Sequence, residues 1–326
     1  RTGLLVMPVG SAKFGLFAAA GAGGGSAGYF GGGRQSAASY ASTIESFDFS
    51  DDSRSVSSTV LSSPRRALAG MSNAGVAGYF SGGKTQTSAY GSAVVEKFAF
   101  ADSSISTLST GLSYTGDLPR GMSNSGTAGY TTGGYAYSGG WINYDTVDKF
   151  AFSNDARSTL STGLSMARYG GYGMSNSGTA GYYAGGREVG GAGNVTTVDK
   201  FAFSNDSRST LSASLPAGRY YGASMSNSGT AGYCAGGHDG NTLSAIEKYT
   251  FSTDTRATLS AGLSAAAYGT AGISNSGAAG YVGGGAGFLT TVDKLAFSND
   301  SRTTLSEGLT TGTYSLAGIQ NEESLA

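Results

Sequence analysis

The stretch MSNSGTAGYYAGG, beginning at Met174, and the stretch TTVDKFAFSNDSRSTLSASL, beginning at Thr196, together form one copy of a repeating unit. The Gly-Tyr pair of this unit occurs in six copies, at Gly28, Gly78, Gly129, Gly181, Gly232 and Gly280. The intervals between these glycines are 50, 51, 52, 51 and 48 residues. A period of this length is typical of architectures built from repeated supersecondary units.

Each copy contains four strand candidates. The first, around GMSN, ends in an Asn-Ser-Gly turn at 176–178, where we expect Asn and Gly to take a positive φ. The second, AGYYAGG, ends in Gly185-Gly186, which should allow close backbone approach where strands crowd a central axis. The third, TVDKFAF, has apolar groups on both faces, and the turn SNDS leads into the fourth, RSTLSASL. The unit is therefore a four-stranded antiparallel meander.

Meanders that are apolar on both faces must pack against one another, either in a linear stack or in a ring. A ring is favoured because it needs no polar capping units, and none is evident at either end of the sequence. We therefore expect an all-β fold, a six-bladed β-propeller of four-stranded blades over residues 13–312, preceded by an N-terminal segment, 1–12.

The ends of the chain offer two candidates for one strand position. KFGLFAAAG, from Lys13, and TYSLAGIQNEE, from Thr313, both resemble a first strand. Residues 313–326 are thus either the ring closure or an extra strand. A surplus strand would pack outside the ring or pair with a neighbouring molecule, because exposed strand edges accept partners.

Composition excludes several classes of function. With 20 basic and 21 acidic residues interspersed, the chain lacks the basic patch that nucleic acid or anionic lipid requires. No apolar run reaches the length of a membrane span, so no membrane insertion is expected. The single histidine, His238, and the single cysteine, Cys234, argue against copper, zinc and triad chemistry. We expect no metal and no cofactor, and we expect Cys234 to be a small buried hydrophobe.

The repeat resembles that of the kelch family, in which an apolar strand ends in Gly-Gly, a variable loop and an acidic-x-aromatic strand follow, and a Pro-Arg-like segment leads to the next unit. These features are Gly82-Gly83, Glu96 with Phe98, and Pro119-Arg120, and the match spans about 14–311. Arginine or another residue replaces the family's usual Trp. The VDKFAFS arrays are also similar to repeats of phage tail-fibre and microbial surface proteins. The resemblance implies a kelch-like propeller with an extracellular, cell-surface or virion location.

A residue present in every blade points in six directions, so it cannot converge on one site and is interpreted as structural. Such residues form an acidic series and an arginine series, which we expect to pair because buried charges need partners. The aspartate of each ND or DD turn is expected to cap its own hairpin. The two series are Glu45, Glu96, Asp148, Asp199, Glu247 and Asp293, and Arg54, Arg157, Arg208, Arg256 and Arg302.

Positions that do not repeat are where a binding site is expected. The loops between the second and third strands vary most, and in a meander they share a rim with the links between blades. Their Tyr, Trp, Ser, Gly and Asn content is typical of adaptable binding loops. The link residues Tyr169, Tyr220 and Tyr268 either join this site or pack between blades. The candidate ligand-binding residues are Tyr90, Tyr135, Tyr137, Trp141, Tyr144, His238, Asp239 and Asn241.

Three functions are compatible with this pattern. The first is a non-catalytic structural or adhesive propeller whose tyrosine-rich loop face attaches to a glycan or a protein. The second is a self-assembling subunit of a fibre or virion, which includes a homo-oligomer. The third is a hydrolase or lyase that uses a carboxylate pair drawn from Asp117, Asp145, Glu188 and Asp239.

Overall fold

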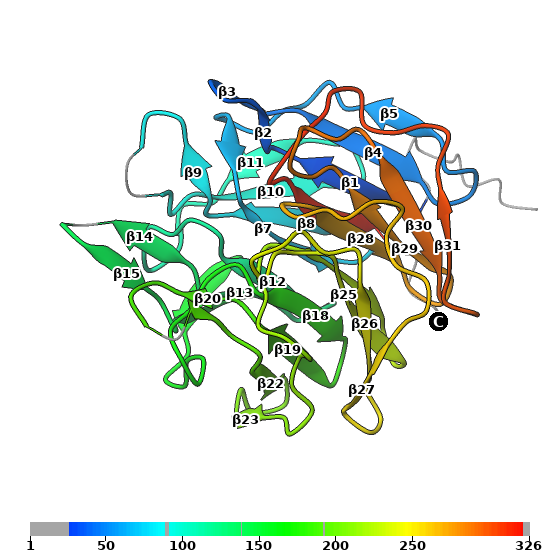
Figure 1. Ribbon diagram of the computed structural model, residues 1–326. Coiled ribbons are helices and arrows are strands. Elements are labelled where there is room, and N and C mark those ends of the chain that lie inside the picture. The colour runs from blue at the N-terminus through cyan, green and yellow to red at the C-terminus, as the bar shows by residue number, and fades with distance from the viewer. Residues whose placement is uncertain (1–25, 89–90, 138, 192, 322–326) are drawn as a thin grey trace, which may run out of the picture.

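The computed structural model describes residues 26–88, 91–137, 139–191 and 193–321. Six four-stranded antiparallel sheets surround one axis, which confirms the prediction of a six-bladed β-propeller (Figure 1). Among the described residues there is no helix long and apolar enough to cross a membrane.

Every blade has the strand order inner, second, third, outer. The inner strands are β32 (Ala317–Asn321), β7 (Ala69–Asn73), β12 (Arg120–Asn124), β18 (Tyr172–Asn176), β24 (Ala223–Asn227) and β28 (Ala271–Asn275). The second strands are β1 (Ala27–Gly31), β8 (Ala77–Ser81), β13 (Ala128–Thr132), β19 (Ala180–Ala184), β25 (Ala231–Ala235) and β29 (Ala279–Gly283).

The third strands are β4 (Ile44–Asp48), β10 (Val95–Ala99), β16 (Val147–Ala151), β22 (Val198–Ala202), β26 (Ile246–Thr250) and β30 (Val292–Ala296). The outer strands are β5 (Arg54–Val56), β11 (Ile105–Thr107), β17 (Ala156–Thr159), β23 (Arg208–Thr210), β27 (Thr255–Thr258) and β31 (Ser301–Thr304). Blades are numbered 1 to 6 in the order of these lists. Four short ladders lie in loops and links: β2 (Arg34–Ser36) with β3 (Ser39–Tyr40), β6 (Arg65–Arg66) with β9 (Lys84–Thr85), β14 (Tyr135–Tyr137) with β15 (Trp141–Asn143), and β20 (Arg187–Glu188) with β21 (Gly193–Asn194).

The C-terminal strand closes the ring. β32 pairs with β1 in the register Ala27↔Asn321 to Gly31↔Ala317, so the last residues of the repeat array supply the inner strand of blade 1. The competing segment from Lys13 lies outside the described residues. Closure joins the two ends of the array without a capping unit, as a propeller requires.

The cores lie between blades rather than within them. Six apolar clusters each combine side chains of two neighbouring blades, for example Met122 and Tyr130 of blade 3 with Phe201 and Phe203 of blade 4. The glycine of each Gly-Tyr pair makes room for the preceding blade, because a Cβ on Gly181 would lie 2.8 Å from the Sδ atom of Met122. The repeat therefore encodes the contact between blades.

Two expectations about turns and glycines need correction. In the turn at 176–178 only Gly178 has a positive φ, so the prediction for the asparagine was wrong. The N–H of Gly178 is bound by the preceding blade, where the side-chain oxygen of Asn124 accepts it at 2.8 Å. Gly185 and Gly186 do have positive φ, but a Cβ on Gly185 would meet the Arg219 carbonyl at 2.6 Å, in the link that leads to the next blade. Crowding at the axis instead falls on inner-strand glycines.

Where the links reach the axis, a closed ring of backbone hydrogen bonds joins all six. One residue per link donates its N–H to the carbonyl of the corresponding residue in the preceding link, over 2.5 to 3.2 Å. All six have positive φ, although four are not glycine. The ring therefore holds a backbone conformation that is unfavourable for L-residues. Its members are Ala67, Leu118, Gly170, Tyr221, Gly269 and Ser315.

Candidate functional site

The loops between second and third strands and the links between blades share one face, as predicted. Backbone bridges join the two kinds of segment at Asp117↔Tyr135, Tyr169↔Arg187 and Tyr220↔His238. We call this surface the loop face. It encircles the mouth of the axis on the side of the backbone ring.

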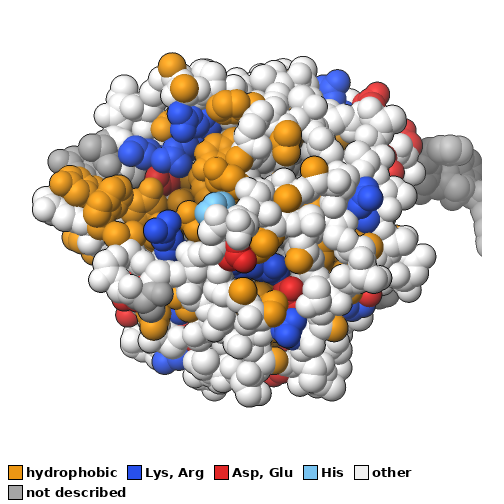
Figure 2. Space-filling view, in the orientation of Figure 1, with side chains coloured by type: hydrophobic (Ala, Val, Ile, Leu, Met, Phe, Trp, Pro, Cys, Tyr) orange, Lys and Arg blue, Asp and Glu red, His pale blue; other side chains and the backbone are white. Residues whose placement is uncertain are grey.

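A continuous band of aromatic contacts crosses the loop face. Trp141 contacts Tyr137 and Tyr135 at centroid distances of 5.2 and 5.3 Å, and Tyr135 lies 4.4 Å from Tyr169. The contacts continue inward through Tyr220, His238, Tyr268 and Tyr314 to Tyr221. Figure 2 shows hydrophobic side chains gathered from the left edge of this face towards its centre, with basic groups beside them.

Exposure divides the band into an outer part and an inner part. Trp141 and Tyr137, on the β14–β15 hairpin, are 57% and 43% exposed, and their neighbour Ile142 is 43% exposed. Tyr169 and Tyr221 are buried at the inner end. Tyr169 is thus packed as part of the scaffold, and it contacts Tyr135, which in turn contacts Trp141.

The other predicted site residues are less closely grouped. The ring of Tyr144 packs on Tyr114 at a centroid distance of 4.4 Å, and none of the ring contacts found among the described residues joins it to Trp141. His238 belongs to the band, whereas Asp239 accepts the backbone N–H of the exposed Asn241 in a local turn. Tyr90 lies outside the described residues.

Two charged residues next to the band, Arg66 and Asp117, were not among the predicted ligand-binding residues, and Asp117 was named only as a possible member of a catalytic carboxylate pair. Arg66 donates to Asp117 at 3.1 Å and to the Tyr40 hydroxyl at 3.1 Å, and the hydroxyl of Tyr135 donates to the same carboxylate at 3.2 Å. Burial raises the pKa of Asp117, and Arg66 opposes that shift. Asp117 is thus tied to a cation and a phenol, which makes it a polar support for Tyr135.

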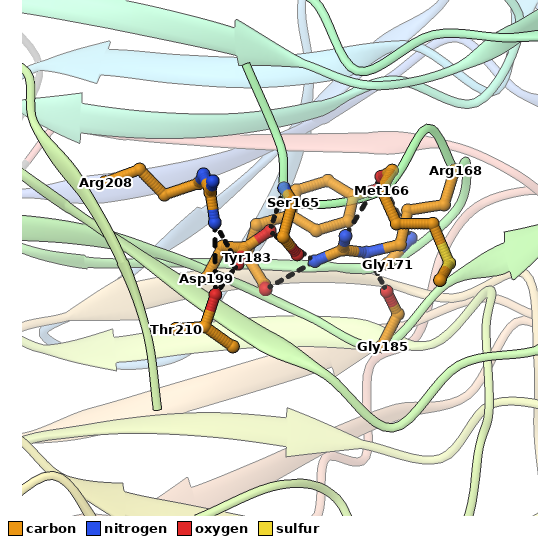
Figure 3. A network of polar contacts seen from close by, with 9 residues as sticks. All are labelled: Ser165, Met166, Arg168, Gly171, Tyr183, Gly185, Asp199, Arg208 and Thr210. Carbon is orange, nitrogen blue, oxygen red and sulfur yellow. Dashed lines mark hydrogen bonds and ion pairs between the residues drawn. The ribbon is translucent and has the colours of Figure 1, made fainter. Parts of the chain in front are cut away.

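The repeated charges form a ladder inside the blades. Figure 3 shows Asp199 between two arginines. Its carboxylate lies 2.9 Å from the guanidinium of Arg168, which is fully buried, and 3.5 Å from that of Arg208, which is partly exposed. Ser165 of the preceding blade donates its backbone N–H to the same carboxylate at 2.8 Å. Burial opposes ionisation, but Arg168 and these hydrogen bonds hold the pKa of Asp199 below its ordinary value. The same pairing joins Glu45 to Arg54, Asp148 to Arg157, Glu247 to Arg256 and Asp293 to Arg302. Glu96, whose blade has Ile105 in place of arginine, pairs with the buried Arg65.

The aspartate of each ND turn differs from expectation, because it binds the preceding blade instead of capping its own hairpin. In the DD turn, Asp51 does cap the hairpin by accepting the N–H of Ser53 at 2.9 Å, and Asp52 binds blade 6. Asp206 accepts the Tyr130 hydroxyl at 2.9 Å and the Lys149 ammonium at 2.7 Å, and both donors belong to blade 3. The preceding residue, Asn205, caps the hairpin by accepting the N–H of Ser207 at 3.1 Å. A positive φ of 57° turns the Asp206 side chain outward from its own turn, towards the neighbouring blade.

Within the described part of the chain, no group of three His, Cys, Asp or Glu side chains is placed to hold a metal ion. Cys234 is buried, and burial raises the pKa of its thiol to about 12. Comparison with known protein families gives no match, and no curated protein is significantly similar to the chain.

Proposed function

We propose that this chain is a non-catalytic, kelch-like propeller that attaches to a glycan through its loop face, on a virion, fibre or cell surface. The observation that carries the proposal is the exposed Trp141 at the end of a continuous aromatic band. Its indole is supported from below by Tyr135, and it has no counterpart in the other five blades.

The geometry of the hairpin favours binding over packing. Trp141 and Tyr137 face each other across the β14–β15 ladder, where they are held as a cross-strand pair. A large aromatic group that remains exposed contributes little to the core, but it offers a rigid apolar surface to a ligand. Because a sugar ring has one apolar face and many hydroxyl groups, it suits an aromatic platform with polar neighbours.

Polar neighbours are present along the band. Arg187 lies over the Tyr220 ring at 5.4 Å and contacts its hydroxyl at 3.2 Å, while its own side chain remains largely exposed. His238 is partly exposed between Tyr220 and Tyr268. These groups can donate to the hydroxyls of a saccharide that rests on the aromatic rings.

A glycan array tests the proposal with three proteins: wild type, Trp141→Ala and Val76→Ala. Val76 is a matched control, because it is also exposed, at 53%, but lies in the turn after an inner strand, away from the loop ladders. We expect wild type and Val76→Ala to bind the same glycans, and Trp141→Ala to lose most of that binding. Absence of any glycan ligand for wild type, or equal binding by Trp141→Ala, would refute attachment through this surface.

Self-assembly is a second candidate, because the exposed apolar group of Tyr137, Trp141 and Ile142 also suits a contact with another copy of the chain. Native mass spectrometry separates the two functions. An oligomer of wild type that dissociates in Trp141→Ala would favour assembly, whereas a monomer in both proteins would exclude assembly through this hairpin.

A further inference from the structure

The axis of the propeller contains a small polar cavity beneath the backbone ring. It has a volume of about 110 Å³ and is walled by the inner strands, with Leu68, Thr270 and Leu316 next to the ring residues. Tyr221 lies across the axis above it, since its hydroxyl bonds Ser315 and also accepts from Arg66 of another link. The cavity is thus covered on the loop face, and it continues at the level of the inner-strand serines towards the opposite face.

The serines of the wall present hydrogen-bond donors to this cavity. Each accepts a backbone N–H from the inner strand of the preceding blade, at 2.8 to 3.0 Å. Because a hydroxyl accepts and donates at once, its O–H is then left to donate, and no described residue receives it. The series consists of Ser72, Ser123, Ser175, Ser226 and Ser274, and Gln320 takes the equivalent place in blade 1.

Arg120 brings the only charge that the described residues contribute to the cavity wall. Its Nε donates to the Gly171 carbonyl at 2.7 Å and its Nη1 to the Pro119 carbonyl at 3.2 Å. No described carboxylate forms an ion pair with it, unlike the buried Arg65 and Arg168. Burial lowers the pKa of this guanidinium, and the nearby tyrosines and Asp117 oppose that shift only in part.

Thr270 adds an unpaired hydroxyl to the same wall. The residue is only 5% exposed, and its Oγ1 has no hydrogen-bond partner among the described residues. It belongs to the link into blade 6, opposite blade 3 and Arg120 across the sixfold ring. A buried hydroxyl without a partner costs free energy, and such groups in native structures commonly mark a site for a ligand, ion or water.

We propose that the axial cavity is a binding site for a small oxyanion, a phosphate-type or carboxylate group, held by the Arg120 guanidinium and by hydroxyl groups from several blades. The described wall contains no carboxylate that would repel an anion. An oxyanion supplies the acceptors that Arg120, Thr270 and the serines lack. The size of the cavity limits the ligand to a small molecule, so this site is separate from the loop face.

Isothermal titration calorimetry with sodium phosphate and with sodium acetate, at constant ionic strength set by chloride, tests the site. The proteins are wild type, Arg120→Gln, Thr270→Val and the control Arg34→Gln. Arg34→Gln is a suitable control because it removes the same positive charge from a loop. There the Arg34 guanidinium donates to the carbonyls of Ser36 and Ala37. Thr270→Val keeps the shape of the side chain and removes a hydroxyl that has no partner, so it should not harm folding.

We expect saturable binding of at least one anion to wild type and to Arg34→Gln, weakened about tenfold or more by Arg120→Gln and a few-fold by Thr270→Val. A preference for phosphate or for acetate identifies the ligand class. The proposal is overturned if neither anion binds wild type at about 10 mM, or if the folded variants bind as wild type does. If Arg120→Gln does not fold, the affinity of Thr270→Val for the anion tests the proposal, and an affinity equal to that of wild type overturns it.

Discussion

One of the six interfaces between blades lacks a contact that the other five have, and restoring it should stabilise the ring. At five interfaces a lysine and a tyrosine of one blade hold the turn aspartate of the next, as Lys149 and Tyr130 hold Asp206. Between blades 1 and 2, Ser46 stands at the lysine position and Ser103 at the aspartate position. The lysine and the aspartate are thus both absent from this interface, whereas the tyrosine, Tyr29, is present.

The backbone at this interface is already suited to the contact. Ser103 has a φ of 57°, the same as Asp206. Tyr29 stacks on Phe100 at 5.4 Å, as Tyr130 stacks on Phe203 at 5.1 Å. The double substitution Ser46→Lys with Ser103→Asp should therefore place a carboxylate between the new ammonium group and the Tyr29 hydroxyl.

The expected gain follows from the exposure of the existing contacts. Side chains of Lys149 and Asp206 are 24% and 25% exposed, so the ion pair should contribute only about 0.5 kcal/mol. The phenol-to-carboxylate hydrogen bond should add about 1 kcal/mol, and aspartate tolerates a positive φ better than serine does. We expect Ser103→Asp to stabilise by about 1 kcal/mol, Ser46→Lys by almost nothing, and the double variant by about 1.5 kcal/mol.

Urea unfolding of wild type, Ser46→Lys, Ser103→Asp and the double variant measures the change in the free energy of unfolding. With a slope of about 3 kcal/mol per molar urea, the midpoint of the double variant should rise by about 0.5 M, and less in 1 M NaCl. Asp206→Ser at an intact interface serves as the mirror experiment and should cost about 1.5 kcal/mol, because it removes both the hydrogen bond from Tyr130 and the ion pair with Lys149. Strictly additive single effects, together with an unchanged midpoint for Asp206→Ser, would show that these contacts contribute nothing to stability.

Three further outcomes follow from the structure. Arg168→Ala should lower the free energy of unfolding in urea by about 3 to 5 kcal/mol, because it leaves the buried Asp199 without its main partner. Arg208→Ala removes a partly exposed partner of the same carboxylate and should lower it by less than about 1 kcal/mol. Similar losses for the two variants would contradict the assigned roles. Cys234, whose thiol is buried with a pKa of about 12, should react with iodoacetamide at pH 8 only after unfolding, and rapid labelling of the native protein would disprove this. Deletion of residues 313–326 should expose the edge of β1 and abolish cooperative unfolding, which circular dichroism would detect; a stable monomer after deletion would contradict ring closure by β32.

The sequence predicted the scaffold well because each repeated residue has one physical role in every blade. Periodicity gave the four strands, and the paired acidic and arginine series located the ladder around Asp199. The partners of the turn residues were not predictable in the same way. Asn124 and Asp206 bind neighbouring blades, and a local pattern cannot distinguish such a contact from a cap within the same turn.

The candidate site was predicted in part, and its omissions have a clear cause. Trp141 and Tyr137 were predictable because their loop has no counterpart. Arg66 was missed, and Asp117 was considered only as a catalytic carboxylate, although both lie at the position that Tyr169 occupies in its own link. The sequence did contain a signal for this pair, since Arg66 and Asp117 are opposite charges at the same position of two neighbouring repeats. The contact of Tyr144 with Tyr114 was not predictable, because Tyr114 lies in the link between blades 2 and 3 and a local pattern does not show which loop it meets.

The loop face can vary because the backbone, and not the side chains, fixes the links. Ala67, Leu118 and Tyr221 differ greatly in size, yet each occupies the same place in the backbone ring with a φ between 57° and 70°. The neighbouring position accepts arginine, aspartate or tyrosine, since its side chain projects from a link that N–H to carbonyl bonds already hold. Substitutions at these positions should therefore leave the propeller folded, which is the property that the proposed attachment surface needs.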